Sequence, residues 1–224
     1  MLKMIENSRY AIFSDKNLEK RIACFDKNAI DVSNQEIHII EDKRGGEADI
    51  TLKLVNPCIG FKKLEDKKCH YFDCNNAADY LLFERKQYSK IDCIYEKERL
   101  KEEWKLHIFE LKKTVKSKEW CHIKVQFLGA LLNAMCLAGF MGISIDKQNI
   151  FLYTAYQNDK IKDTTNPLDL RAQMANISVE EEKKDYSDWF NDFIEISAYE
   201  VFRCKHQKIV LKGELGKAEY CIGE

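Results

Sequence analysis

Proline and glycine are scarce in this chain of 224 residues, which holds 2 prolines and 9 glycines. A sequence so poor in both residues contains no Pro-rich or Gly-rich linker and no long low-complexity segment. It also shows no internal repeat. We therefore expect a single domain that spans residues 1–224.

Net charge is lacking as well, because 36 basic residues offset 37 acidic ones. The field of the whole protein therefore does not attract nucleic acid, and such a partner would need a local basic patch. The first residues carry no apolar signal region. The nine cysteines are odd in number and scattered, which favours free thiols and a cytoplasmic protein.

One long apolar stretch, residues 125–145, has the length of a membrane span. Gln126, Asn133 and three glycines interrupt it. A helix buried against a sheet can be apolar on nearly all sides, so we interpret this stretch as a core helix. We expect no membrane partner.

Strand and helix patterns alternate through the middle of the chain. Two strands around a Gly-Gly turn, at residues 35–41 and 48–55, indicate a β-hairpin. Further apolar patterns indicate strands at 78–84, 104–112 and 149–156, and a long helix at 117–140. This order predicts an α/β fold with a central mixed β-sheet flanked by helices.

The remaining segments carry weaker patterns. Before the apolar core they indicate a short helix at 17–25, a charged connection from 56 to 76, and a surface excursion at 85–103. After it they indicate a polar loop at 157–186, an amphipathic segment at 186–203, and a closing pair of short strands at 209–211 and 220–222.

Two opposite charges close the otherwise apolar strand at 104–112. Side chains alternate along a strand, so Glu110 and Lys112 point to the same face. Asp79 opens the strand at 78–84. If these two strands are neighbours, Asp79 and Glu110 can reach one cation.

Such a cation would be Mg²⁺ or Mn²⁺. Two carboxylates, a backbone carbonyl and waters form the hard oxygen site that these ions prefer. The ion would polarise a phosphate oxygen and lower the pKa of a bound water. Lys112 would orient that water or offset the charge that develops on the phosphate.

The pattern Asp79-Tyr-Leu-Leu-Phe, followed by Ile108-Phe-Glu110-Leu-Lys112, resembles the PD-(D/E)XK nuclease superfamily. The resemblance covers about residues 49–156. It implies a restriction-endonuclease-like core made of a helix, three strands, a helix and a strand. We place this core at approximately residues 47–156, with an N-terminal β-hairpin and a C-terminal extension at 157–224.

The resemblance also implies roles for particular residues. Asp79 and Glu110 would hold the metal, Lys112 would act beside them in catalysis, and Gln126 would match a glutamine of the following helix. Two positions depart from the family pattern: Ala130 stands where a tyrosine follows that glutamine, and Ala78 stands where a proline often precedes the aspartate.

Many members of the superfamily add an upstream glutamate near the metal. Four glutamates are candidates here, namely Glu19, Glu36, Glu41 and Glu47. We choose Glu47 as the third metal ligand.

The expected function is therefore that of a Mg²⁺-dependent or Mn²⁺-dependent nuclease, with DNA preferred to RNA as the substrate. Lys113 and Lys116 follow the catalytic strand, and we expect them to contact phosphates. Glu119, His122, Gln126 and Asn133 form one polar stripe on the predicted helix, which faces either the nucleotide or solvent. The resemblance implies a role in genome defence, repair or mobile elements.

Plainer interpretations stay open. The charges of Glu110 and Lys112 fit a strand end that reaches solvent, Asp79 fits a turn residue, and Gln126 fits a polar residue at the edge of the core. The same fold can serve as a binding module for nucleic acid or protein without catalysis. The amphipathic segment at 186–203 would suit a partner-binding protein, and a homodimer is left open.

A zinc site is a further alternative. Three cysteines and a histidine cluster in the connection after the hairpin: Cys58, Cys69, His70 and Cys74. Structural zinc sites usually use two closely spaced pairs of ligands, and this spacing is irregular.

Overall fold

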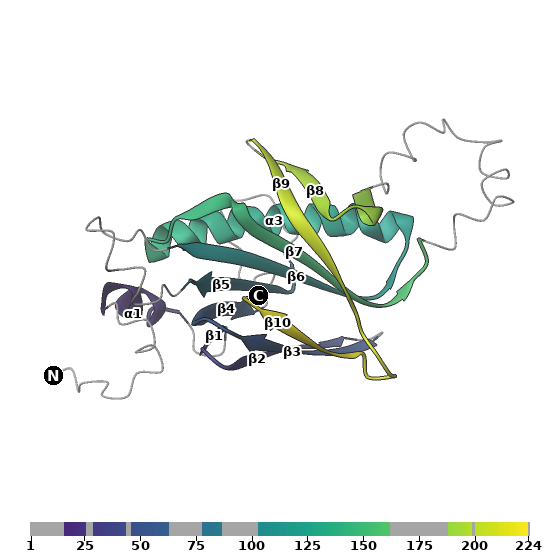
Figure 1. Ribbon diagram of the computed structural model, residues 1–224, viewed down its shortest axis with the longest axis horizontal. Helices are drawn as coiled ribbons and strands as arrows, with labels where there is room; N and C mark the ends of the chain where they lie inside the picture. The colour runs from purple at the N-terminus through teal and green to yellow at the C-terminus, as the bar shows by residue number, and fades with distance from the viewer. Residues whose placement is uncertain are drawn as a thin grey trace, which may run out of the picture.

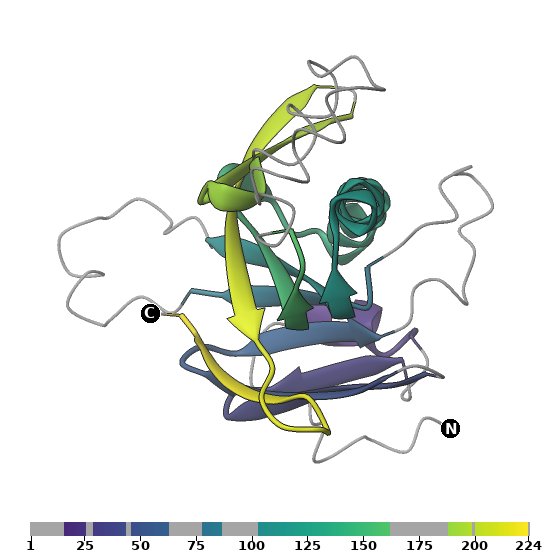
Figure 2. The same ribbon diagram turned by 90° about the vertical axis from the view of Figure 1, so that its right-hand side faces the viewer.

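Three layers make up the protein in the computed structural model, which describes residues 16–25, 29–43, 46–62, 78–86, 103–161, 188–198 and 200–223. A seven-stranded sheet lies in the middle, a three-stranded sheet covers one face, and a long helix crosses the other (Figure 1). Figure 2 looks along the helix and shows the layers edge on. The predicted α/β fold with a mixed central sheet is confirmed, but a second sheet covers one face instead of helices.

The larger sheet has the order β1-β4-β5-β6-β7-β9-β8. Its strands are β1 (Ile30–Ser33), β4 (Cys58–Lys62), β5 (Tyr80–Arg85), β6 (Trp104–Val115), β7 (Ile145–Asp159), β8 (Phe193–Ser197) and β9 (Val201–Val210). β6, β7 and β9 run parallel to one another, and the other neighbours are antiparallel. The carboxyl ends of three parallel strands therefore meet at one edge of the sheet.

The smaller sheet joins segments from both parts of the chain. It consists of β2 (Glu36–Lys43), β3 (Gly46–Leu54) and β10 (Lys217–Ile222), in the order β10-β3-β2. β2 and β3 are antiparallel, with Glu36 opposite Lys53, which confirms the predicted hairpin. β10 lies parallel to β3 on its other side.

Two predicted segments are corrected by this topology. Residues 58–62, expected in a charged connection, form the strand β4, in which Ile59 and Phe61 are buried. The expected closing pair of strands at 209–211 and 220–222 does not form. β9 belongs to the larger sheet and β10 to the smaller one, and a single bridge between Lys212 and Lys217 connects them.

The long helix α3 (Ser117–Met141) forms the crossover between β6 and β7. It ends at Gly142, whose φ of 73° allows the left-handed conformation that closes many helices. By length and composition α3 could cross a membrane. In the structure, however, Trp120, Phe127 and Leu131 are buried against the sheet, as expected of a core helix. The two short helices are α1 (Lys16–Ile22) and η4 (Asp188–Phe190).

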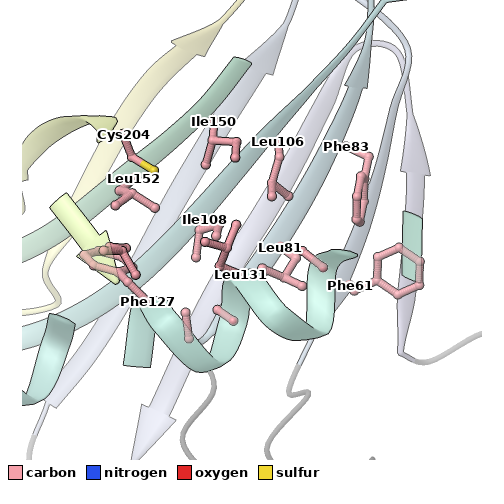
Figure 3. Close-up of a cluster of buried hydrophobic side chains, with 14 of the residues drawn as sticks. Phe61, Leu81, Phe83, Leu106, Ile108, Phe127, Leu131, Ile150, Leu152 and Cys204 are labelled. Atoms are coloured by element: carbon pink, nitrogen blue, oxygen red, sulfur yellow. The ribbon is translucent and has the colours of Figure 1, made fainter. Parts of the chain in front are cut away.

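Two hydrophobic cores lie on the two faces of the larger sheet. Phe127 and Leu131 of α3 point toward aliphatic side chains of the central strands, including Ile108 and Leu152 (Figure 3). On the opposite face, Phe109 packs in the core shared with the smaller sheet. Side chains of β6 thus alternate between the two cores, as the pleat of a strand requires.

A buried polar network crosses the second core. His107 on β6 lies 3.0 Å from Glu84 Oε2 through its Nε2, and 2.9 Å from the Tyr153 hydroxyl through its Nδ1. Asn56 donates a hydrogen bond of 2.5 Å to the other oxygen of Glu84. Burial acts to raise the pKa of Glu84, but the hydrogen bonds from His107 and Asn56 outweigh it and lower the pKa to about 2. The network links β5, β6 and β7 side by side.

The packing of α3 on the sheet generates a prediction for Leu152, which is fully buried. Leu152→Ala should lower the free energy of unfolding by about 2–5 kcal/mol, because it leaves a cavity in the core under α3. Urea unfolding measures the change. Leu215→Ala is the control, since Leu215 is 51% exposed, and it should change stability by less than about 0.5 kcal/mol. Equal effects of the two substitutions would contradict this core.

Candidate active site

The candidate site lies where β5 begins and β6 approaches its end. Tyr80 pairs with Phe109, so the same register places Asp79 opposite Glu110. The carboxylate of Asp79 accepts a hydrogen bond of 2.8 Å from the backbone N–H of Leu111. The prediction that the two strands are neighbours is therefore confirmed, and the structure brings Asp79 and Glu110 together.

Glu110 is buried on the face of the sheet that α3 covers, because it shares the alternation of Leu106 and Ile108. Lys112 lies two residues further along the same face and donates a hydrogen bond to Glu110 Oε1. The other oxygen, Glu110 Oε2, is buried and has no hydrogen-bond partner within the described residues. A buried carboxylate oxygen without a partner is costly, and a bound cation would supply the missing interaction.

Burial raises the pKa of Glu110 to about 8, and the nearby charge of Asp79 acts in the same direction, against the opposing effect of Lys112. Burial acts to lower the pKa of Lys112, but the Glu110 carboxylate outweighs it and raises that pKa above its ordinary value. Without a cation, Glu110 therefore holds a proton up to neutral pH beside a charged Lys112. A divalent cation would displace this proton.

A third carboxylate acts on the same pair. The charge of Glu41, near the end of β2, raises the pKa of both Glu110 and Lys112. Glu41 continues the inward alternation of Ile37 and Ile39 along its strand. That alternation is the sequence signal that could have selected it from the four candidate glutamates.

Glu47, our chosen third ligand, lies in β3 opposite Asp42. Its side chain falls outside the described part of the chain. Of the other two candidates, Glu36 forms an ion pair of 2.7 Å with Lys53, and Glu19 lies in α1. Glu41 is therefore the upstream glutamate that the described residues bring into the electrostatic surroundings of Glu110.

The donor set fits a hard divalent cation. Across the described ranges, no group of three or more His, Cys, Asp and Glu side chains is arranged to hold a metal ion. Mg²⁺, however, commonly binds through one or two carboxylates and keeps several waters and substrate phosphate oxygens as its other ligands. Asp79 and the partnerless oxygen of Glu110 supply such a pair of carboxylates.

A polar row extends from Glu110 across the parallel strands. Glu110 pairs with Thr154 of β7, and Thr154 pairs with Lys208 of β9. Thr154 is fully buried, and its hydroxyl lies 3.0 Å from Nε2 of His206. Burial and the charge of Lys208 lower the pKa of His206 to about 3, so this ring is neutral. No local sequence pattern marks Thr154 or His206, because β6, β7 and β9 become neighbours only in the folded protein.

The polar residues that were predicted to form a stripe on the long helix lie partly in the interior and partly at the surface. Gln126 is buried on α3, and its Oε1 has no hydrogen-bond partner within the described residues. Glu119 likewise has a buried Oε2 without such a partner, whereas His122 is exposed. The predicted polar stripe therefore does not lie wholly on a solvated face.

The two lysines that were predicted to contact phosphates lie at the surface. Lys113 is exposed near the end of β6, and Lys116 is exposed at the residue that precedes α3. Both follow Lys112 closely in the chain. Alternation along β6 turns Lys113 to the face opposite Glu110 and Lys112, whereas Lys116 follows the end of the strand.

The structure describes only part of the alternative zinc site and of the amphipathic segment at 186–203. Cys58 is buried in β4, where its thiol donates to the backbone oxygen of Asn56, and burial raises its pKa. The other three members of the proposed zinc cluster, Cys69, His70 and Cys74, lie outside the described residues. The described cysteines are free thiols. The amphipathic segment at 186–203 contributes η4, β8 and the start of β9.

No protein-family model matches the sequence, and searches of curated protein sequences and of solved structures give no significant match.

The raised pKa of Glu110 predicts how the stability of the metal-free protein depends on pH. Its pKa of about 8 in the folded state exceeds its ordinary value of 4.5, so the folded protein keeps a proton that the unfolded chain releases. The stability of the wild type relative to Glu110→Gln should therefore fall as the pH rises from 5 to about 8. Urea unfolding in EDTA across this range measures the difference.

Glu36→Gln is the control for this pH series. The pKa of Glu36 in the wild type is lowered, chiefly by a hydrogen bond from Lys53. The contribution of Glu36 to the free energy of unfolding is therefore lost only as the pH falls through acidic values. The difference between wild type and this variant should stay flat between pH 5 and 8. A flat series for Glu110→Gln as well would show that Glu110 is not protonated in the folded protein.

Metal binding should stabilise the folded protein through the same carboxylates. Mn²⁺ or Mg²⁺ should raise the melting temperature of the wild type, and more at pH 8 than at pH 6, because the cation needs ionised carboxylates. Asp79→Asn and Glu110→Gln should abolish the shift. Glu41→Gln should reduce it more than Glu36→Gln, the matched change on the same strand. An equal shift in all four variants would contradict the site.

Proposed function

We propose that the protein is a metal-dependent nuclease that hydrolyses phosphodiester bonds with Asp79, Glu110 and Lys112. The observation that carries the proposal is a buried glutamate with one partnerless oxygen, held between a second carboxylate and a lysine at the ends of two neighbouring strands. Buried, mutually perturbed charged groups of this kind are typical of catalytic sites.

The order of elements supports the proposal. β4, β5 and β6 form an antiparallel meander, and α3 then connects β6 to the parallel strand β7. The PD-(D/E)XK resemblance implies a helix, three strands, a helix and a strand, with the aspartate at the start of the second strand and Glu-x-Lys on the third. β4 to β7 with α3 follow this order from the first strand onward, but the strand β3 precedes β4 where the resemblance implies a helix. We accordingly propose a restriction-endonuclease-like core at β4 to β7, to which the hairpin, β9 and β8 are added.

Each residue has a role that its position allows. Asp79 and Glu110 would hold Mg²⁺ or Mn²⁺, which supplies a Lewis acid and a bound water of lowered pKa. Lys112 would exchange its bond to Glu110 for contact with the attacking water or the phosphate. Gln126 would use its unpartnered amide oxygen to position the water, and Lys113 and Lys116 would hold neighbouring phosphates. We keep DNA as the preferred substrate over RNA.

A binding module without catalysis is the second candidate function. The hydrogen bond that Lys112 donates to Glu110 favours it, because Lys112 already occupies one oxygen that a metal would use. The two functions differ in whether nucleic acid is only bound or also cut.

A cleavage assay tests the nuclease. Purified protein should cut single-stranded or double-stranded DNA, or RNA, with Mg²⁺ or Mn²⁺ and not with EDTA. Glu110→Ala and Lys112→Ala should each lower the rate by about a hundredfold or more, because each removes a charge that acts on the reacting phosphate. Glu195→Ala and Lys205→Ala, two exposed residues of β8 and β9, are the matched controls and should cut like the wild type.

The remaining outcomes separate the alternatives. Cleavage retained in both site variants, or cleavage that survives EDTA, would refute the assignment. Binding of nucleic acid without any cleavage would instead support the binding module.

A further inference from the structure

The long helix α3 carries apolar residues on two sides, although only one side packs on the sheet. Phe127 and Leu131 belong to the inner side and are buried. Successive residues of a helix turn by about 100°, so Val125 points away from Phe127. A second apolar row follows from Val125 every three or four residues. We call it the outer stripe, and its members are Val125, Leu128, Leu132, Met135 and Gly139.

The outer stripe is only partly covered in the described structure. Val125 is 42% exposed, and Phe140, which flanks the stripe, is 51% exposed. Gly139 is exposed as well, and the other members are of intermediate burial. α3 lies on the side of the larger sheet away from the smaller sheet (Figure 2). The stripe therefore presents apolar groups on an outer layer of the protein.

Charged residues are missing along the outer stripe. None occurs between Lys124 and Asp146. A helix with one face in solvent normally carries charged residues on that face. Single exposed apolar side chains are ordinary, but a charge-free row over roughly four turns indicates a surface that is covered in the assembled protein. Alternating steps of three and four residues are the spacing of a seam between two helices.

Gly139 adds an independent observation. It lies within α3, and its backbone does not adopt the left-handed conformation that favours glycine. A Cβ atom here would meet no heavy atom within 4 Å outside its own stretch of helix, so packing among the described residues does not require glycine either. Glycine destabilises the interior of a helix relative to alanine. The close approach of a second helix would account for it, because the distance between two helix axes depends on the side chains at the contact.

The outer stripe is complementary to itself about a two-fold axis at Leu132. Val125 lies seven residues before Leu132, and Gly139 lies seven residues after it. When two copies of α3 pack antiparallel across this axis, Val125 of each copy enters the space that Gly139 of the partner subunit leaves open. An isologous contact brings the same surface of both copies together, and the absence of charge in the stripe avoids repulsion between like charges. Antiparallel helix dipoles also attract each other.

We propose that two copies of this chain form a dimer through α3, packed antiparallel along the outer stripe with Leu132 at the two-fold axis. The other described helices, of 7 and 3 residues, are too short to cover the stripe. One helix pair buries less than about 1,200 Å² in total, so the dimer should dissociate in the micromolar range. The inner side of α3 keeps its packing on the sheet. The proposal does not depend on the nuclease function.

Sedimentation equilibrium over a wide range of protein concentration tests the dimer. The buffer contains EDTA and a reducing agent, because Cys136 is exposed. The mean mass of the wild type should rise from that of one chain toward twice that value. Gly139→Leu should weaken association about tenfold or more, because the new side chain fills the space that Val125 of the partner subunit would enter. Its melting temperature should stay the same or rise, since the added side chain meets open space and leucine favours a helix.

Leu132→Lys places two like charges at the axis and should also weaken association about tenfold or more. Leu215→Lys is the matched control, because Leu215 is 51% exposed and lies outside α3. This variant should associate like the wild type. Val125→Ala, combined with Gly139→Leu, is the specific check, since a smaller side chain then faces the new leucine. The combination should restore association at least in part.

A wild type that is monomeric at every concentration would overturn the proposal. Normal association of Gly139→Leu, an equal loss in Leu215→Lys, or a failure of Val125→Ala to restore association would overturn it too. Binding of a monomeric wild type to vesicles of phosphatidylcholine and phosphatidylserine would likewise overturn it, and would assign the outer stripe to a membrane surface. None of these outcomes depends on whether the protein cleaves nucleic acid.

Discussion

The burial of β6 on both faces is the constraint on which the rest of the structure depends. Ile108 packs under α3 and Phe109 packs against the smaller sheet, so each successive side chain belongs to a different core. A slip of one residue would move every side chain of β6 to the opposite face. The two cores therefore determine the face on which Glu110 lies, without any contact specific to a ligand.

The burial of Glu110 near the end of β6 costs electrostatic free energy. Glu110 has no exposed surface, and its Oε2 has no hydrogen-bond partner in the described structure. Lys112 compensates one oxygen, while Asp79 is tied to the backbone N–H of Leu111 and stays close as a second negative charge. Removing this cost would stabilise the fold, so its presence is typical of a site maintained for binding or catalysis.

Local sequence patterns were sufficient to predict the parts of this site that lie within one strand or on two strands that follow each other in the chain. Alternation along 104–112 placed Glu110 and Lys112 on one face, and the meander brought Asp79 beside them. The pairing of β10 with β3 joins distant parts of the chain and leaves no local signal. β4 was missed because four buried residues after Pro57 are too short a run to separate from a loop. Thr154 was missed for a related reason: its place beside Glu110 depends on the crossover through α3.

β9 and β10 belong to different sheets, and a recess lined by residues of both strands lies between them. β8 pairs with β9 only up to Lys205, so the following residues of β9 form an edge of the larger sheet among the described strands. Open strand edges invite association with other chains, and lysines at an edge discourage it. Lys212 and Lys217 lie opposite each other where β9 ends and β10 begins, and their charges therefore help to keep this edge from pairing with another chain.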